Sequence, residues 1–150
     1  MVVNKTFMIK ATKAEDIQEL TPRLRQDDIN EIEALGFNSL ISLMDGYLIS
    51  DECYSVFVDN HIIGMFGINI TSHSIWFLGS DGCNDAKREW VKAGRYYINH
   101  FLELSPVLFN TVSTQNKLHI KWLKRMGAKF SAPYLFNNHY FQDFYIIKGE

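Results

Sequence analysis

The first fifty residues combine one short apolar run with a longer region in which apolar side chains recur at helical spacing. Thr12 and Glu15 have the spacing of a capping box, which predicts the start of a short helix. Apolar residues three and four positions apart predict two more helices after Pro22. The expected elements are a strand over 7–11, a helix through Leu20, a helix over 27–35 that stops at Gly36, and a helix over 39–49.

The middle of the chain changes to the shorter period of strands. Two runs rich in β-branched and aromatic residues flank Asp59-Asn60, a dipeptide typical of tight hairpin turns. A third run ends at Gly79, and a long amphipathic helix follows that cannot continue past Ser105, because Pro106 comes next. The expected elements are strands over 53–58, 61–70 and 74–78, a loop over 79–84, and a helix that ends at 105.

The last third alternates between strands and one helix. Residues 115–126 carry apolar side chains at helical spacing, and Gly127 follows as a C-terminal cap. Strands are expected over 107–112, 129–136 and 140–147. The order of elements excludes an all-helical bundle and a regular doubly wound fold. It predicts a mixed α+β fold, in which helices flank a central, mostly antiparallel mixed sheet.

Composition narrows the class of protein. The 150 residues are 47% hydrophobic and 21% charged, which is the profile of a single globular domain spanning 1–150. The net charge of −2 offers no overall field for a polyanion, so we expect no nucleic-acid partner. The chain start lacks the apolar stretch of a signal peptide, and no stretch approaches the ~18 apolar residues that a bilayer requires, so no membrane partner is expected.

Residues suited to nucleophilic or metal chemistry are sparse. Cys53 and Cys83 are isolated, which indicates free thiols in a reducing compartment. The five histidines are too scattered for a metal-ligand pattern, so no metal is expected. Residues 79–82 lack the Gly-x-Ser-x-Gly spacing of a serine nucleophile.

The order of elements resembles that of the GNAT N-acetyltransferase superfamily. In that superfamily a strand and two helices precede an antiparallel trio, a cofactor helix, a fifth strand, a fourth helix and a closing strand pair. The best local match is residues 116–128, an Asn followed by an amphipathic helix that stops at a Gly. The resemblance covers most of the chain and implies a GNAT-like fold. It also implies that acetyl-CoA binds and gives its acetyl group to an amine acceptor.

A narrower resemblance is to the internal virion protein A family of short-tailed bacteriophages, which is itself GNAT-like. It implies a phage protein that works in the host bacterial cytoplasm or in the virion, with virion or host proteins as partners. The residues that carry it are Trp76-Phe77, Asn116, His119-Ile120, Leu123-Lys124, Gly127-Ala128 and Ile147-Lys148-Gly149.

The resemblance places the cofactor along the third strand of the trio and the loop after it. GNAT proteins hold the pyrophosphate on N–H groups at a helix N-terminus, where the helix dipole favours an anion. This loop departs from the family's spaced glycines, and Asp81 and Asp85 repel a pyrophosphate, whereas Lys87 and Arg88 can compensate. Alternatively, Asn84 or Asp85 merely caps the helix and the basic pair is solvated. The candidate cofactor-binding residues are Phe77, Leu78, Gly79, Gly82, Asn84 and Asn116.

Candidates for proton transfer are weaker. GNAT enzymes that use a general acid usually carry Tyr on the fourth helix, and the matching Leu123 has no proton to donate. His119, one turn earlier, is a candidate substitute, although a lone His on an amphipathic helix is more often a packed residue. Glu52, just before the first hairpin strand, is a weak candidate for the base, beside His61, Asn69 and His73. None of the four stands out from a turn or surface residue.

A basic stripe follows one face of the helix over 115–126. It can meet the 3′-phosphate of coenzyme A or an acidic partner, or it can be the solvated face opposite the apolar one. The stripe consists of Lys117, Lys121, Lys124 and Arg125.

Two hypotheses from different classes remain. In the first, the protein is a GNAT-like acyl-CoA enzyme with a rebuilt phosphate loop. In the second, it is a catalytically degenerate GNAT fold used in phage virion assembly or in binding a host protein. Both share the fold, so fold alone does not decide between them. The enzyme hypothesis requires a slot beside the strand over 74–78 that admits a pantetheine arm.

Overall fold

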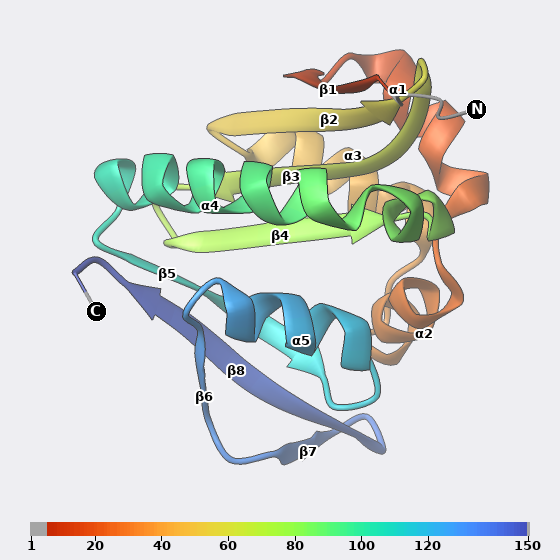
Figure 1. Cartoon of the computed structure of the whole chain (residues 1–150). Coiled ribbons are helices and arrows are strands. Elements are labelled where there is room, and N and C mark those ends of the chain that lie inside the picture. Colours follow the sequence, from red (N-terminus) through yellow and green to blue (C-terminus); the bar gives the residue numbers. More distant parts are fainter. Residues whose placement is uncertain (1–5, 150) are drawn as a thin grey trace.

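The computed structural model describes residues 6–149 and shows one central sheet with helices on both faces (Figure 1). Its elements are, in chain order, β1 (Phe7–Ala11), α1 (Ala14–Leu20), the 3-10 helix η1 (Thr21–Arg23), α2 (Gln26–Ala34), α3 (Ser39–Ile49), β2 (Glu52–Val58), β3 (His61–Asn69), β4 (Ser74–Gly79), the 3-10 helix η2 (Asp81–Ala86), α4 (Lys87–Leu104), β5 (Val107–Ser113), α5 (Lys117–Arg125), β6 (Lys129–Phe130), β7 (Tyr134–Phe136) and β8 (His139–Ile147).

The sheet has the strand order β1-β2-β3-β4-β5-β8-β6, with β7 paired to β8. Every pairing is antiparallel except that of β4 with β5, which is parallel and consists of the single pair Ser74 and Phe109. The mixed, mostly antiparallel α+β fold expected from the sequence is therefore confirmed. The sheet consists of two halves that meet at one residue pair and diverge beyond it.

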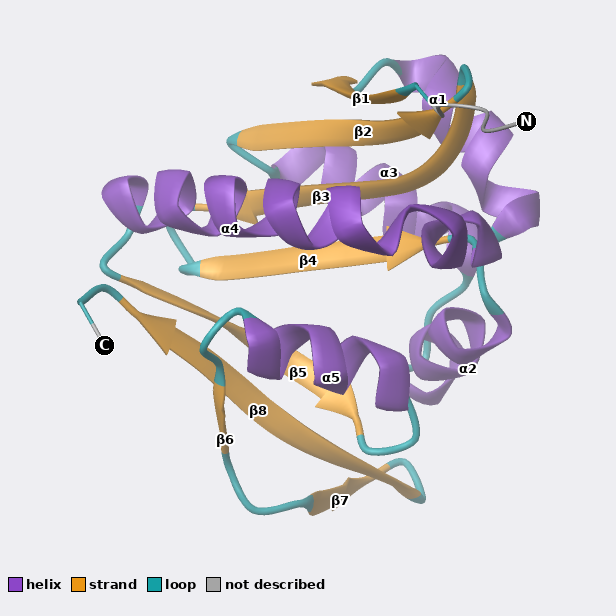
Figure 2. Ribbon diagram, viewed as in Figure 1, coloured by secondary structure: helices purple, strands orange, loops and turns teal. Residues whose placement is uncertain are grey.

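Helices cover the two faces of the sheet unequally (Figure 2). On one face, α4 and α5 pack on both halves, and their core includes Trp90, Phe101 and Leu123. On the other face, α1, α2 and α3 pack on the first half around Leu43 and Met65, which are fully buried. Each such side chain contributes about 1.5–3 kcal/mol through burial. The two cores fix the helices against the strands that border the divergence.

The turn and the helix cap predicted at Asp59-Asn60 and Gly127 have the left-handed backbone conformation that these residue types favour. Asp59 and Asn60 have φ values of 51° and 67°, as a tight hairpin turn requires. Gly127 has φ 88° and ends α5, and the Ala128 N–H donates to the Leu123 carbonyl at 3.0 Å. This is the backbone pattern of a glycine-terminated helix.

The sequence-based expectations differ from the structure at three places. The N-cap of α1 is Lys13 rather than Thr12, and the Asp16 carboxylate accepts from the Lys13 backbone N–H at 2.8 Å. The Thr12 hydroxyl is instead bonded to Ser55 at 2.9 Å across the sheet. The strand expected over 129–136 is split into β6 and β7 around Pro133, which has no N–H for the ladder. The segment expected as a loop over 79–84 contains most of η2.

No helix within residues 6–149 is long and apolar enough to cross a membrane. Cys53 and Cys83 are both free thiols, as their isolation in the sequence predicted.

Gly94 of α4 provides a test of the packing between α4 and α5. A Cβ added there would lie 2.5 Å from Cζ2 of Trp122. Gly→Ala in a helix interior normally stabilises by about 1 kcal/mol, whereas overpacking a close-packed contact costs about 1–3 kcal/mol. Gly94→Ala should therefore lower the free energy of unfolding by about 1 kcal/mol, measured by urea denaturation. The loss should shrink in a Trp122→Phe background, and an equal loss in both backgrounds would contradict the contact.

Candidate functional site

The divergence of β4 and β5 opens a gap in the middle of the sheet. Next to the single pair of Ser74 and Phe109, the side-chain amide of Asn110 donates to the Ile75 carbonyl at 2.8 Å. Backbone groups of alternate residues point to the same edge of a strand, so those of Phe77 face the gap as those of Ile75 do. The backbone N–H and C=O of Phe77 therefore face the gap and form no ladder hydrogen bond with β5.

Two pockets meet at this gap. One has a volume of about 360 Å³ and extends through the sheet, with walls from α2 and α3 on one side and from α4 and α5 on the other. The second has a volume of about 580 Å³ and lies between the N-terminal half of α4 and α5. We call them the through-sheet pocket and the interhelical pocket. The residues lining both are Phe77, Trp90, His119 and Trp122.

Aromatic rings stand where the pockets meet. The ring of Trp90 stacks on Phe77 with centroids 4.7 Å apart and on Trp122 with centroids 5.3 Å apart. The slot that the enzyme hypothesis requires is therefore present beside β4, but a three-ring stack narrows it. Within residues 6–149, the buried side-chain polar atoms without a hydrogen-bond partner are Trp122 Nε1 and His119 Nδ1. Both belong to residues at this junction.

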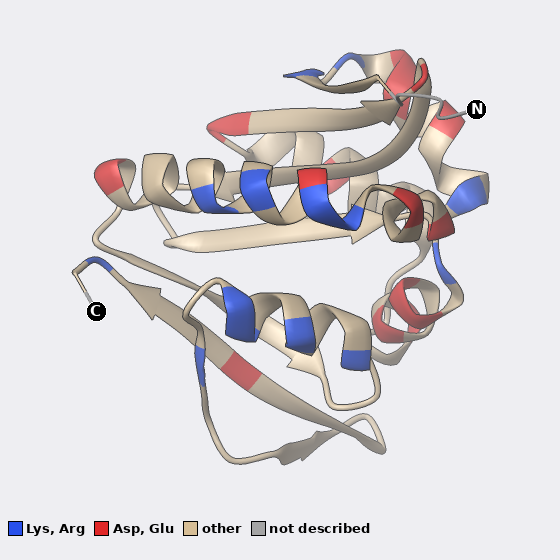
Figure 3. Ribbon diagram, in the orientation of Figure 1, with Lys and Arg blue, Asp and Glu red and all other residues tan. Residues whose placement is uncertain are grey.

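The interhelical pocket is strongly basic. Figure 3 shows Lys and Arg positions, in blue, along the ribbons of α5 and of the N-terminal half of α4. Residues of both helices line the pocket. No Asp or Glu of the described residues lines it. Its cationic lining residues are Arg25, Lys87, Arg88, Lys92, Arg95, Lys121 and Arg125. Cations focused in a cleft attract an anionic ligand even though the whole chain is slightly acidic.

The basic stripe expected on α5 is divided between pocket and solvent. Lys121 and Arg125 line the interhelical pocket, whereas Lys117 and Lys124 are exposed outside it. Only half of the stripe can therefore contact a ligand in the interhelical pocket.

The loop before α4 does not form an open cradle of N–H groups. The N–H of Gly82 donates to the Ser80 hydroxyl at 3.1 Å, and a Cβ on Gly82 would lie 2.7 Å from the Ile63 side chain. The N–H of Gly79 donates to Asp28 at 3.0 Å. Of the candidate cofactor-binding residues, Phe77 and Asn84 line the interhelical pocket, and Phe77 and Leu78 line the through-sheet pocket. An anion in the interhelical pocket therefore meets cationic side chains more than loop amides.

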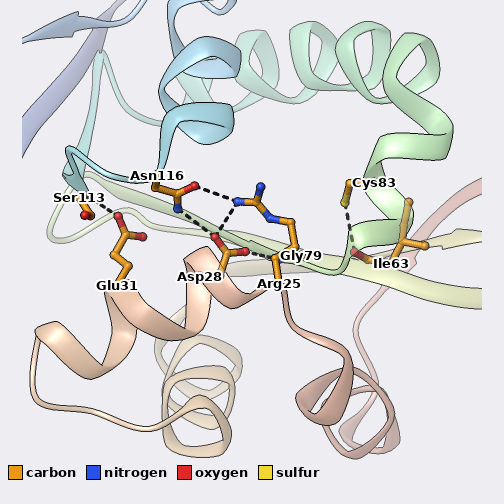
Figure 4. A network of polar contacts seen from close by, with 8 residues as sticks. All are labelled: Arg25, Asp28, Glu31, Ile63, Gly79, Cys83, Ser113 and Asn116. Atoms are coloured by element: carbon orange, nitrogen blue, oxygen red, sulfur yellow. Dashed lines mark hydrogen bonds and ion pairs between the residues drawn. The ribbon is translucent and has the colours of Figure 1, made fainter.

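Asn116, the last candidate cofactor-binding residue, belongs to a buried polar network at the end of the gap (Figure 4). Asp28 is fully buried, and its Oδ1 accepts from Arg25 at 2.9 Å and from the Asn116 amide at 3.0 Å. Its Oδ2 accepts from the Gly79 N–H. The network joins α2 to the end of β4 and to the start of α5, which lie on opposite sides of the gap.

Glu31, one turn after Asp28, reaches the other border of the gap. Its carboxylate accepts from the backbone N–H of Ser113 at the end of β5. Burial raises the pKa of the Glu31 carboxyl to about 7, an effect that the Ser113 hydrogen bond opposes and the neighbouring Asp28 charge increases. The carboxyl therefore exchanges its proton near neutral pH.

His119 lies next to this carboxyl. Atoms of Asp28, Glu31 and His119 that can bind a proton or a metal all lie within 4.8 Å of one another. Burial lowers the pKa of the His119 imidazole, with the Asp28 charge opposing the shift, so the ring is neutral at pH 7. A metal fits this set poorly, because both Asp28 oxygens already accept hydrogen bonds and the Arg25 cation stands 2.9 Å away.

The other candidate residues lie elsewhere or are chemically inert. Glu52 accepts from the Tyr54 hydroxyl, is paired with His100 at 2.8 Å, and lines neither pocket. Cys83 donates to the Ile63 carbonyl at 3.2 Å, and burial raises the pKa of its thiol to about 12. Cys83 is therefore not a nucleophile at neutral pH. His119 is the candidate for proton transfer that lies at the gap.

Comparison with known proteins shows the family of this chain. The family model described as the bacteriophage T7 probable scaffold protein Gp13 matches residues 54–135. The probable scaffold protein gp13 of Escherichia phage T7 is 31% identical over 145 residues, covering 94% of this chain and 97% of that protein. This chain belongs to the Gp13 family. It is therefore a phage protein, in agreement with the narrower of the two sequence resemblances.

Solved structures show that this Gp13-family chain has the fold of the GNAT acetyltransferases. Ard1 from Thermoplasma volcanium superimposes with a TM-score of 0.73 at 17% identity, covering 96% of this chain and 99% of that one. An aminoglycoside acetyltransferase in complex with coenzyme A has a TM-score of 0.68 at 11% identity, with 95% of each chain covered. Spermidine N-acetyltransferase from Vibrio cholerae, in complex with coenzyme A and spermine, has a TM-score of 0.63 at 12% identity, again with 95% of each chain covered.

The raised pKa of Glu31 makes the stability of the protein depend on pH. The folded protein binds this proton up to about pH 7, whereas the unfolded chain loses it near 4.5. The free energy of unfolding should therefore fall by roughly 3 kcal/mol from this group as the pH rises through that window. Glu31→Gln keeps an acceptor for Ser113 but has no proton to lose. Urea unfolding at pH 5 and pH 8 should show a smaller decrease for E31Q than for the unaltered protein, and parallel decreases would contradict the assignment.

Proposed function

We propose that this protein binds acetyl-CoA in the two joined pockets and transfers the acetyl group to an amine. The observation that carries the proposal is the gap between β4 and β5, which opens into a basic pocket on one face of the sheet and a largely apolar one through it. In acetyl-CoA, the phosphate-bearing nucleotide suits the basic pocket, and the long uncharged arm suits the largely apolar one. Bound acetyl-CoA supplies an activated thioester carbonyl.

The residues present fit this cofactor at three points. Lys87 and Arg88 of α4, with Lys121 of α5, would hold phosphate groups in place of loop amides. The backbone N–H of Phe77 faces the gap and would donate to the thioester oxygen, where negative charge develops during acyl transfer. Trp122 Nε1 is a buried donor without a partner, so it is available to donate a hydrogen bond to a ligand at the pocket junction.

Two features limit the rate that such a site can reach. Leu123 replaces the tyrosine that serves as general acid in related enzymes, so the thiolate leaves without a proton donor at that position. A thiol has a pKa near 8.5, so the loss slows the reaction without preventing it. The Phe77–Trp90–Trp122 stack must also shift for an arm to pass between the pockets. We therefore expect slow turnover with measurable binding.

Binding can be tested by charge reversal on α5. Lys121→Glu places a carboxylate in the interhelical pocket and should weaken acetyl-CoA binding roughly tenfold, which corresponds to about 1.4 kcal/mol. Lys117→Glu changes the same charge on an exposed part of the same helix and serves as the matched control. Calorimetric titration at low and high salt measures both, and the difference should fall as salt screens the charges. Absence of binding at millimolar acetyl-CoA, or equal effects of both variants, would remove the proposal.

A second function, in particle assembly, is favoured by the family itself. The T7 relative covering nearly all of this chain is described as a probable scaffold protein. We infer that this chain also takes part in building the phage particle, with virion proteins as its partners. The GNAT fold is compatible with both functions, since fold does not determine function.

The assembly role predicts where the protein is found. Quantitative mass spectrometry of purified procapsids and mature particles of the encoding phage should detect the chain in a fixed number of copies per particle in at least one of the two. Comparison with a host cytoplasmic protein of similar abundance corrects for contamination. A chain that is no more enriched in either particle than the host protein would contradict an assembly role.

A further inference from the structure

The through-sheet pocket has a second mouth on the α2–α3 side, and its chemistry differs from that of the interhelical pocket. Its lining contains no Lys or Arg among the described residues. The acidic residues that line it are Glu31 and Asp45. Its other walls at this mouth include Phe37, Ile49 and Trp76, which are apolar. Charges of opposite sign are thus separated across the sheet, with cations on the α4–α5 side and carboxylates on the α2–α3 side.

Glu31 and Asp45 differ in where they lie. Asp45 is exposed on α3, whereas Glu31 is mostly buried, next to the gap. The backbone N–H of Ser113 holds the Glu31 carboxylate at the end of β5, and His119 lies within 4.8 Å on its other side. His119 also lines the interhelical pocket, so Glu31 is one side chain away from the basic site.

We propose that Glu31 is the acceptor-site carboxylate, which binds the ammonium group of a small primary amine with an apolar stem. This inference rests on the proposed acyl transfer and names its acceptor class. A carboxylate in an apolar cavity without a neighbouring free cation favours a cationic head group, and the apolar walls favour a hydrocarbon stem over a polar chain. A volume of about 360 Å³ holds a molecule of the size of 2-phenylethylamine.

The same carboxylate can prepare the amine for attack. One proton moves from the ammonium nitrogen to a Glu31 oxygen, which leaves a neutral amine with a free electron pair and a neutral carboxylic acid. The transfer replaces a buried ion pair by two neutral groups, which the low-dielectric surroundings favour. The charged groups facing Glu31 are Asp28 and Arg25, which form an ion pair with each other. His119 stays neutral and does not compete for the proton.

Binding of 2-phenylethylamine to the full chain, measured by calorimetry without acetyl-CoA, tests the inference. Glu31 is mostly protonated at pH 6 and mostly ionised at pH 8, while the amine carries its charge at both. Affinity should therefore be about tenfold higher at pH 8. Glu31→Gln should abolish this pH dependence and weaken binding at pH 8 about tenfold. Asp45→Asn, the matched control at the exposed mouth, should change affinity less than threefold.

Two comparison ligands separate the contributions of charge and stem. The alcohol 2-phenylethanol keeps the stem but has no charge, and spermidine keeps the charge but has a polar polycationic chain. Both should bind more weakly than 2-phenylethylamine at pH 8. Equal binding of the alcohol, unchanged binding by E31Q, or affinity independent of pH would overturn the inference. If E31Q fails to fold, the pH profile of the unaltered protein and the two comparison ligands still decide.

The outcome is independent of the acetyl-CoA experiment. Loss of amine binding with intact, Lys121-dependent acetyl-CoA binding would reject the acceptor site and leave the cofactor site. Amine binding without acetyl-CoA binding would leave an amine site but remove acyl transfer.

Discussion

Helix α2 connects the two halves of a sheet that hardly pair with each other. β4 and β5 share one residue pair, so their ladder alone cannot hold the halves at a fixed angle. Asp28 links the end of β4 to Asn116 at the start of α5, and Glu31 links α2 to the end of β5. The buried Arg25–Asp28 pair and Glu31 therefore bridge the two halves at the open end of the gap (Figure 4).

The helices that border the gap also carry charges of opposite sign on its two sides. The helix dipole and the lysines and arginines of α4 and α5 make one side of the gap positive. The acidic residues of α2 and α3 make the other side negative. These opposing fields coexist in a chain with a net charge of −2 because each is confined to one side of the sheet.

Most of the fold could be predicted from the sequence, because hydrophobic period and turn residues are local signals. The bounds of β1 and α3 and the Asp59-Asn60 hairpin follow directly from them. The strand predicted over 129–136 is split in the structure, and Pro133, which has no N–H for the ladder, was the signal in the sequence for that split. The prediction that Thr12 caps the first helix was wrong, because the Thr12 hydroxyl bonds to Ser55, which lies 43 residues away in the chain. Long-range hydrogen bonds of this kind leave no trace in local spacing.

Of the candidate site, the sequence yielded the residues near the strand–helix junctions but not those on α2. Phe77, Asn84 and His119 were predicted, since the family resemblance points to their segments, and the structure places all three on the interhelical pocket. Glu31 and Asp28 resemble any acidic residues on a solvated helix face. One signal was available: Arg25, Asp28 and Ile32 follow helical spacing, so an ionisable pair shares a face with an apolar core residue.

The buried charges of this site are costly in a purely structural element. Replacing a buried ion pair by apolar residues of similar volume is often neutral or stabilising. Here, however, Asp28 also accepts hydrogen bonds from the Gly79 N–H and from Asn116, which an apolar side chain would leave without a partner. A site that must discriminate an anion on one side from a cation on the other needs ionisable groups between them. Arg25 lines the interhelical pocket and Glu31 the through-sheet pocket, so the position of these groups where β4 and β5 diverge is compatible with the proposed binding role.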